Sequence, residues 1–198
     1  QAFACGGLSV YTKFCTPSCI GGLVNMANLF ARLERTIHHQ WIALRDPAER
    51  IFSPALRKRL AQHVAASETT HTGQIRIYTE SGLPLSYLWR NASSRERAIS
   101  IFGKQRVWDT EQNNGVLIYL LLADHAIELV ADRGLNRHIQ PQVWSDIAKR
   151  MGHALAGNQW EQGLCHAVDE VTALLQVHFP ATAQEPGSNE LEDAPVVR

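Results

Sequence analysis

Hydrophobic residues recur every three or four positions in several stretches of the chain, the spacing that places them on one face of an α-helix. The first such stretch covers residues 26–46 and ends before Pro47. Its apolar positions are Leu29, Leu33, Ile37, Trp41 and Leu44. Ser53 and Pro54 suit the N-cap and first turn of a second helix that reaches about residue 70. The same spacing predicts further helices over residues 94–107, 141–156 and 159–179, and a helical turn over 135–139.

Three shorter stretches have the pattern of β-strands. Residues 74–79 and 126–131 alternate apolar and polar side chains, whereas residues 116–123 (VLIYLLLA) are apolar on both faces, as in a central strand covered by helices on each side. The helix over 94–107 joins the first two strands, which predicts a right-handed parallel crossover. A tight turn at 124–125 then adds an antiparallel hairpin. We therefore expect an α/β fold, a three-layer α/β/α sandwich with a small mixed sheet.

The same pattern divides the chain into segments. Residues 26–52 form an N-terminal amphipathic helix and residues 53–180 form the α/β domain. Residues 181–198 are polar, acidic and contain Pro and Gly, so we expect a disordered tail. Residues 1–25 lack regular patterning, and we expect a non-native or disordered extension before Met26.

Composition narrows the classes of partner. Nineteen basic residues balance nineteen acidic ones, so no large basic field is available for phosphate backbones, and we expect no nucleic-acid partner. Residues 26–62 are nonetheless basic, with seven Arg or Lys against three acids. A solvated helix face is the expected reason, and a weak peripheral contact with anionic lipid is the alternative. No stretch reaches the roughly 20 apolar residues of a transmembrane helix, so we expect no transmembrane segment.

The cysteines and histidines do not indicate a metal or catalytic centre. Cys5, Cys15 and Cys19 lie in the unpatterned segment at spacings unlike those of zinc sites, and nothing requires an oxidising compartment, so we expect a cytoplasmic location. The adjacent His38 and His39 point in different directions on a helix. The sequence also contains no G-x-S-x-G, G-x-x-x-x-G-K-[ST], G-x-G-x-x-G or H-E-x-x-H motif. It therefore assigns no catalytic residue and no organic cofactor.

Carboxylate and amide side chains flank the two central strands. With these strands parallel, Glu80 and Asp124 follow their carboxyl ends at one edge of the sheet. The loop before the second strand and the end of the third strand meet at the other edge, where five residues would converge on a cation. These residues are Asp109, Glu111, Asn113, Asn114 and Asp132. Oxygen donors without Cys or His suit Ca²⁺ or Mg²⁺. The alternative is that Asp and Asn serve turns, through hydrogen bonds to nearby backbone.

The stretch over residues 113–135, N-N-G-V-L-I-Y-L-L-L-A-D-H-A-I-E-L-V-A-D-R-G-L, resembles the core of the TPM domain. This family is named after a thylakoid lumen phosphatase, a photosystem II repair protein and a nematode receptor modulator. The resemblance extends from about Pro54 to Phe179 and includes R-x-W-D-T-E-x-N-N-G at 106–115. It looks closest to a soluble bacterial branch that is often encoded beside membrane-anchored TPM proteins.

The resemblance implies an α/β/α sandwich, binding of divalent cations and, for the plant protein, acid phosphatase activity. It implies membrane-associated TPM proteins or other proteins as partners. Asn136 stands where many members have an acid, which weakens the implied cation site, and the membrane anchor common after the domain does not carry over. We therefore expect a cation-assisted binding or membrane-protein quality-control module, with a metal-dependent acid phosphatase as the alternative.

Overall fold

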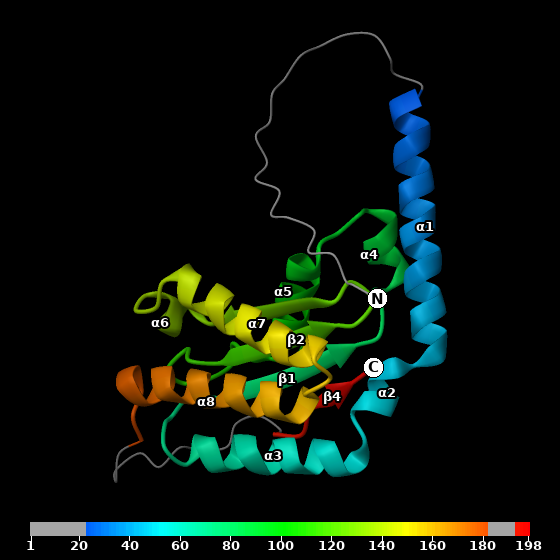
Figure 1. Cartoon of the computed structure of the whole chain (residues 1–198). Coiled ribbons are helices and arrows are strands. Elements are labelled where there is room, and N and C mark those ends of the chain that lie inside the picture. Colours follow the sequence, from blue (N-terminus) through cyan, green and yellow to red (C-terminus); the bar gives the residue numbers. More distant parts are fainter. Residues whose placement is uncertain (1–22, 182–192) are drawn as a thin grey trace.

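The computed structural model describes residues 23–181 and 193–198 (Figure 1). Its helices are α1 (Leu23–Arg45), α2 (Pro47–Ile51), α3 (Pro54–Glu68), α4 (Leu85–Trp89), α5 (Ser94–Lys104), α6 (Arg133–Asn136), α7 (Pro141–Ala156) and α8 (Trp160–His178). Its strands are β1 (Ile75–Glu80), β2 (Val116–Leu121), β3 (Ala126–Ala131) and β4 (Val196–Val197). The long predicted helices and all three predicted strands are present, whereas the five-residue helices α2 and α4 were not predicted. The three cysteines of residues 1–22 lie outside the described residues.

The strands form one mixed sheet in the order β3-β2-β1-β4. β1 and β2 are parallel, with Ile75 opposite Val116, and they are connected through α4 and α5. β2 and β3 form the predicted antiparallel hairpin, with Val116 opposite Ala131. The parallel crossover and the hairpin predicted from the sequence are thus confirmed.

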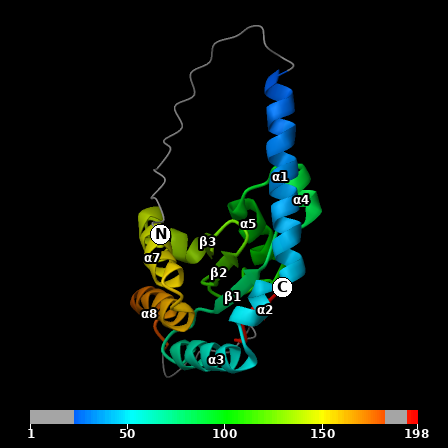
Figure 2. The ribbon, with the colours of Figure 1, turned by 45° about the vertical axis from the view of Figure 1, so that its right-hand side comes forward.

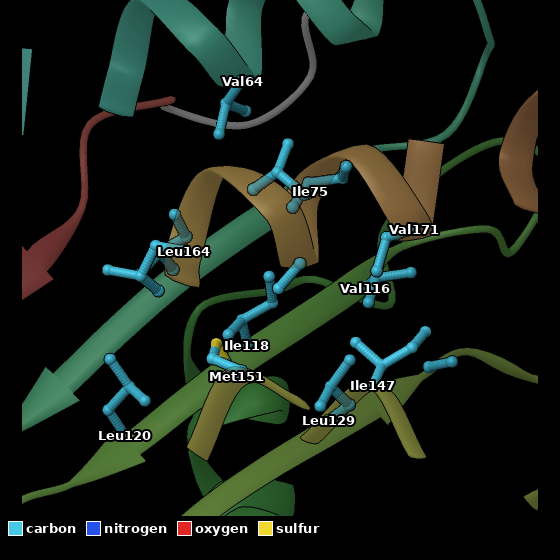
Figure 3. Close-up of a cluster of buried hydrophobic side chains, with 14 of the residues drawn as sticks. Val64, Ile75, Val116, Ile118, Leu120, Leu129, Ile147, Met151, Leu164 and Val171 are labelled. Atoms are coloured by element: carbon cyan, nitrogen blue, oxygen red, sulfur yellow. The ribbon is translucent and has the colours of Figure 1, made fainter. Parts of the chain in front are cut away.

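Helices cover both faces of this sheet, which gives the α/β/α sandwich expected from the sequence. One face packs against α3, α7 and α8 in a core that includes Ile118, Met151 and Leu164 (Figure 3). The other face packs against α4 and α5 through a second core. Every residue of β2 is buried because both layers cover it, in agreement with its continuous apolar run. Among the described residues, no helix has the length and apolar character needed to cross a membrane.

β1 is also buried on both faces, although its alternating pattern resembled that of a strand with one polar face. Glu80 and Arg97 are 4% and 5% exposed and form a two-pronged ion pair beneath the α5 layer. Tyr119 donates its hydroxyl proton to Glu80 Oε2 at 2.8 Å. These partners satisfy the buried carboxylate, which explains how a charged residue occupies the interior of the sandwich.

Helix α1 stands along the margin of the molecule, with one side against the domain (Figures 1 and 2). The predicted amphipathic pattern of α1 is confirmed. Its apolar face, however, points away from the domain, whereas in most surface helices the apolar face packs on the core. His39 is fully buried, while Leu33 and Ile37 are 54% and 60% exposed. The helix therefore turns polar side chains toward the domain and apolar side chains toward solvent.

The end of the chain differs from the disordered tail predicted for residues 181–198. Val196 and Val197 form β4, which pairs in parallel with Tyr78 and Thr79 of β1. Ser81 N–H and Thr79 O extend this pairing through hydrogen bonds to Arg198. Without β4, β1 would be an edge strand with unpaired backbone N–H and C=O groups. The two valines pair with these groups, although the sequence around them does not predict a strand. Residues 182–192 lie outside the described part of the tail.

Candidate functional site at the amino end of the parallel strands

The carboxyl ends of β1 and β2, where α/β sheets commonly bind ligands, are covered by α1 and α2. Asp124, in the turn after β2, accepts hydrogen bonds from His39 Nε2 and Arg35 Nη2, both at 2.9 Å. His39 Nδ1 accepts the Leu83 N–H at 3.1 Å, so Nε2 carries the proton. Ser81, which follows β1, bonds to the first turns of α2. The polar side chains of Ser81 and Asp124 at this edge are therefore occupied by structural contacts.

Electrostatics reinforce the attachment of α1. Burial alone would raise the pKa of Asp124, but the hydrogen bond from Arg35 and the charges of His39 and Arg35 lower it overall. The pKa of His39 is lowered overall, chiefly by burial and also by the charges of Arg35 and His38, although Asp124 opposes this, so the imidazole is neutral at pH 7. The sequence assigned Asp124 to a turn only, whereas the folded chain also uses it to hold α1.

At the opposite edge, the loop before β2 and the end of β3 are joined through their backbones. The Asp132 N–H donates to Gly115 O, and the Gly134 N–H donates to Asn113 O, both at 2.9 Å. Asn113 has a φ of 53°, which asparagine tolerates better than most residues. A Cβ atom on Gly134 would lie 2.4 Å from Asn113 O, so this close approach requires glycine. Residues 110–115 and 132–134 therefore form one structural unit, called here the Asn-Asp junction.

Four of the five predicted cation ligands, all except Asp109, belong to the Asn-Asp junction, and three of these have buried or half-buried side chains. Asn113 is half-buried, and Asn114 and Asp132 are buried. Asp109 and Glu111 are exposed, and their side chains form no hydrogen bond or ion pair with other described residues. Backbone pairing brings the first three together, whereas no packing directs the two exposed acids toward them, and their role as ligands stays a prediction.

Two buried oxygen atoms of the Asn-Asp junction have no hydrogen-bond partner within the described residues. They are Asn114 Oδ1 and Asp132 Oδ2. Asn114 Nδ2 donates to Thr72 Oγ1 at 3.1 Å, and Asp132 Oδ1 accepts the Arg133 N–H at 2.6 Å. An unpaired buried acceptor costs about 1–3 kcal/mol, and oxygen atoms are the ligands of Ca²⁺ and Mg²⁺. The chemistry of the junction therefore fits a hard cation.

The charge of the junction limits the strength of such binding. Asp132 is its buried carboxylate, and the Arg133 Nε atom lies 3.0 Å from Asn113 Oδ1. In residues 23–181 and 193–198, no three His, Cys, Asp or Glu side chains gather as they would around a tightly held metal. Asn136 uses its amide to bond Ala131 O at 2.7 Å. A cation would thus bind weakly here, with a Kd on the order of 10⁻⁴–10⁻³ M.

Residues just before β1 complete this end of the sheet, although no sequence pattern marks them as part of a site. His71 is fully buried and its Nε2 has no partner among the described residues. Burial lowers its pKa, so the ring is neutral at pH 7. Thr72 Oγ1 donates to Gln112 Oε1 at 2.8 Å and accepts from Asn114. The signal that could have revealed them is the predicted parallel pairing of β1 and β2, because the residues that precede two neighbouring parallel strands lie side by side at one edge of the sheet.

Glu68, the last residue of α3, lies buried near the same end of β1. Its Oε1 accepts the Ile75 N–H at 2.8 Å. Burial raises the pKa of the Glu68 carboxyl to about 8, the Ile75 hydrogen bond opposes this rise, and the neighbouring Asp193 carboxylate adds to it. Asp193 precedes β4, so this carboxyl pair lies where the end of the chain meets the domain.

The raised pKa predicts a pH dependence of stability. Between pH 4.5, the ordinary pKa of glutamate, and pH 8, the unfolded chain loses the Glu68 proton while the folded chain keeps it. Stability contributed by this residue therefore falls as pH rises through that window, by up to about 1.4 kcal/mol per pH unit. We expect Glu68→Gln, which keeps the bond to Ile75, to be more stable than the wild type at pH 8 and similar at pH 4.5.

Urea unfolding midpoints measured from pH 4.5 to 8.5 for both proteins check this expectation. The difference between the two curves isolates Glu68 from the histidines, which titrate in the same range. A constant difference across the window would contradict the assignment.

Comparison with known proteins identifies the family. The family model of the TPM domain matches residues 45–174. The BA42 protein of the psychrophilic bacterium Bizionia argentinensis, known from an NMR structure, has a similar fold, with a TM-score of 0.63, 20% identity, and coverage of 73% of this chain and 93% of that chain. The comparison with curated proteins gave no match. Because the family match spans most of the chain and includes β1, β2, β3 and the Asn-Asp junction, this chain belongs to the TPM domain family.

Proposed function

We propose that this TPM-domain chain is a binding or quality-control module that acts on other proteins and that binds a divalent cation weakly at the Asn-Asp junction. One observation carries the proposal: Asn114 Oδ1 and Asp132 Oδ2 are buried oxygen atoms without hydrogen-bond partners in the described chain. A bound Ca²⁺ or Mg²⁺ would supply the positive charge that these atoms lack. Asn114 and Asp132 would hold it, and the exposed Asp109 and Glu111 are further ligands that the loop could supply.

A binding role suits the junction better than hydrolysis. Apart from the exposed Glu111 and Arg133, its polar side chains are amides, the Asp132 carboxylate and the Thr110 hydroxyl. The neighbouring Thr72 hydroxyl already bonds the amides of Gln112 and Asn114, so among these residues no nucleophile lies against a general base. The neutral His71 donates to the Gly73 carbonyl rather than to a nucleophile. A cation at such a site stabilises the loop before β2 and thereby the surface that the loop presents.

Arg133 favours a second candidate, a metal-dependent phosphatase. Its guanidinium is exposed and held beside the junction by the bond from Nε to Asn113 Oδ1. An arginine next to a bound cation provides the positive charge that phosphoryl oxygens require. In this candidate Arg133 would bind the phosphate, and the cation would polarise a phosphoryl oxygen.

A thermal-shift titration with Ca²⁺ and Mg²⁺ tests cation binding. At a concentration near 100 times Kd, we expect stabilisation of about 2.7 kcal/mol, which raises Tm by several degrees for a domain of this size. Asp132→Asn, which retains the cap on Arg133, should lose the shift. Asp146→Asn, a partly exposed carboxylate of α7, serves as the control and should retain it. An unchanged Tm in the wild type at 20 mM cation would refute cation binding.

Hydrolysis of a generic phosphomonoester, measured with and without Mg²⁺ or Ca²⁺, separates the two candidates. The binding module should give no turnover above the buffer rate. Cation-dependent turnover that is lost in both Asp132→Asn and Arg133→Gln would instead establish the phosphatase. Arg106→Gln, an exposed arginine before the same loop, controls for general loss of positive charge.

A further inference from the structure

Helix α1 has an apolar face that no described part of the chain covers. Six large apolar residues along it are each at least half exposed, at 51–85%. They are Leu29, Phe30, Leu33, Ile37, Trp41 and Leu44. At 100° per residue they share an arc of about 120° of the helix surface. The polar side that includes Arg35 and His39 faces the domain, so the exposed face is the result of a specific attachment.

The size of this face matches a protein interface. Taking on the order of 200 Å² for each residue, the six exposed fractions leave roughly 750 Å² of apolar surface. The largest apolar patch of a typical monomer covers about 300–600 Å², whereas each partner of a standard interface buries about 800 Å². The exposed apolar surface of α1 is therefore large enough to form an interface with a partner.

The spacing along the face is that of a helix that packs on another helix. Phe30, Leu33, Ile37, Gln40 and Leu44 follow one another at intervals of three, four, three and four residues. These are successive a and d positions of a heptad repeat that extends over two heptads and the first position of a third, with Gln40 as the single polar member. Such a seam favours a helical partner over a flat one.

The charges along the face favour a second copy of the same helix. By the helical repeat, Glu34 and Arg45 lie along one edge of the face, three turns apart. In an antiparallel pair related by a two-fold axis, the same edges of the two helices adjoin in opposite directions. Glu34 of one copy would then lie beside the half of the partner helix that contains the second copy's Arg45.

An anionic lipid surface fits the same face less well. Helices that lie on membranes have many Lys and Arg residues on their polar side. α1 contains no lysine and three arginines, of which Arg35 is already bound to Asp124 and Asn91 of the domain. Glu34, beside the apolar face, would be repelled by anionic head groups.

We propose that the chain forms a two-fold symmetric dimer through antiparallel pairing of α1 with α1 of a second copy. The domain lies on the side of the helix opposite the apolar face, as the contacts of Arg35 and His39 establish, so two copies can approach without collision of their domains (Figures 1 and 2). α1 precedes almost all of the matched TPM region, 45–174, so the dimer interface is separate from the Asn-Asp junction. This inference does not depend on cation binding.

Sedimentation equilibrium of the full chain over about 1–200 µM tests the proposal directly. We expect the average mass to rise with concentration from that of the 22.1 kDa monomer toward twice that value. Leu33→Glu and Ile37→Glu should each raise the dissociation constant by on the order of 100-fold or more, because a charge would replace a central apolar contact. Val177→Glu and Ile99→Glu, at exposed apolar positions on α8 and α5, are matched controls that should dimerise like the wild type.

The unfolding midpoints of Leu33→Glu and Ile37→Glu, measured well below the dissociation constant, should equal that of the wild type because both residues are exposed in one copy. A wild-type chain that stays monomeric at 200 µM would overturn the proposal without reference to any variant. A dimer that resists both α1 substitutions would overturn it as well. Monomers that co-sediment with phosphatidylserine vesicles, and lose this binding in Leu33→Glu, would assign the face to lipid instead.

Discussion

Replacement of Gly115 by alanine is expected to destabilise the fold more than any conservative change elsewhere in the Asn-Asp junction. A Cβ atom at this position would lie 1.9 Å from Val107 O and 3.0 Å from Val107 C, so backbone rather than a flexible side chain must move. Gly115 O also accepts the Asp132 N–H, which joins the loop to the end of β3. We expect a loss of at least about 3 kcal/mol, visible as a clear fall in the urea midpoint.

Gly103→Ala provides the matched control for this substitution. Gly103 lies near the end of α5, and no atom lies within 4 Å of a Cβ added there. Alanine is favoured over glycine in a helix by about 0.5–1 kcal/mol, so this variant should be slightly more stable than the wild type. If Gly115→Ala were as stable as Gly103→Ala, the close approach of the loop to Val107 would be wrong.

Removal of the Glu80 carboxylate is expected to cost about 3–5 kcal/mol, because Glu80→Ala leaves the Arg97 guanidinium charged and buried without its counter-ion. The Tyr119 hydroxyl also loses its acceptor. The ordinary pKa of an arginine side chain lies far above pH 7, so Arg97 stays charged after Glu80 is removed and loss of its proton cannot relieve the cost. Chemical denaturation at pH 7 measures the change in the free energy of unfolding.

Two further variants distinguish the effect of burying a charge from the effect of losing an ion pair. Glu96→Ala removes the partner of Arg90 in an ion pair whose side chains are about half exposed, and it should cost at most about 1 kcal/mol. The double variant Glu80→Met with Arg97→Met removes both buried charges and should recover a large part of the loss. Equal effects of Glu80→Ala and Glu96→Ala would contradict the buried position of the pair.

The candidate site was predictable where it depends on the hairpin and unpredictable where it depends on loops. The period of β2 and β3 predicts their pairing, and that pairing alone brings Asn113 and Asn114 to Asp132. The directions of Asp109 and Glu111 follow no strand or helix period, and both side chains are exposed. The positions of His71 and Thr72 beside Asn114 could not be predicted because they depend on the register between β1 and β2.

The sequence by itself determined the type and order of the main elements. The caps at Ser53 and Ser93, the helical spacings and the continuous apolar run of β2 are properties of neighbouring residues, and each predicts its element without knowledge of the rest. The family followed from the same local stretch, where close backbone approach requires glycine at positions 115 and 134 and Asn113 adopts a positive φ.

Only the tertiary structure decided which face of each element is buried and which polar groups meet. The pattern of α1 shows an apolar face, but the bond from Arg35 to Asp124, 89 residues away, turns that face to solvent. The pattern of β1 shows polar residues, but Arg97 allows Glu80 to be buried. β4 has almost no pattern of its own and exists because β1 offers an unpaired edge. Periodicity depends on residues close in sequence, whereas these outcomes depend on charges and hydrogen bonds between distant segments.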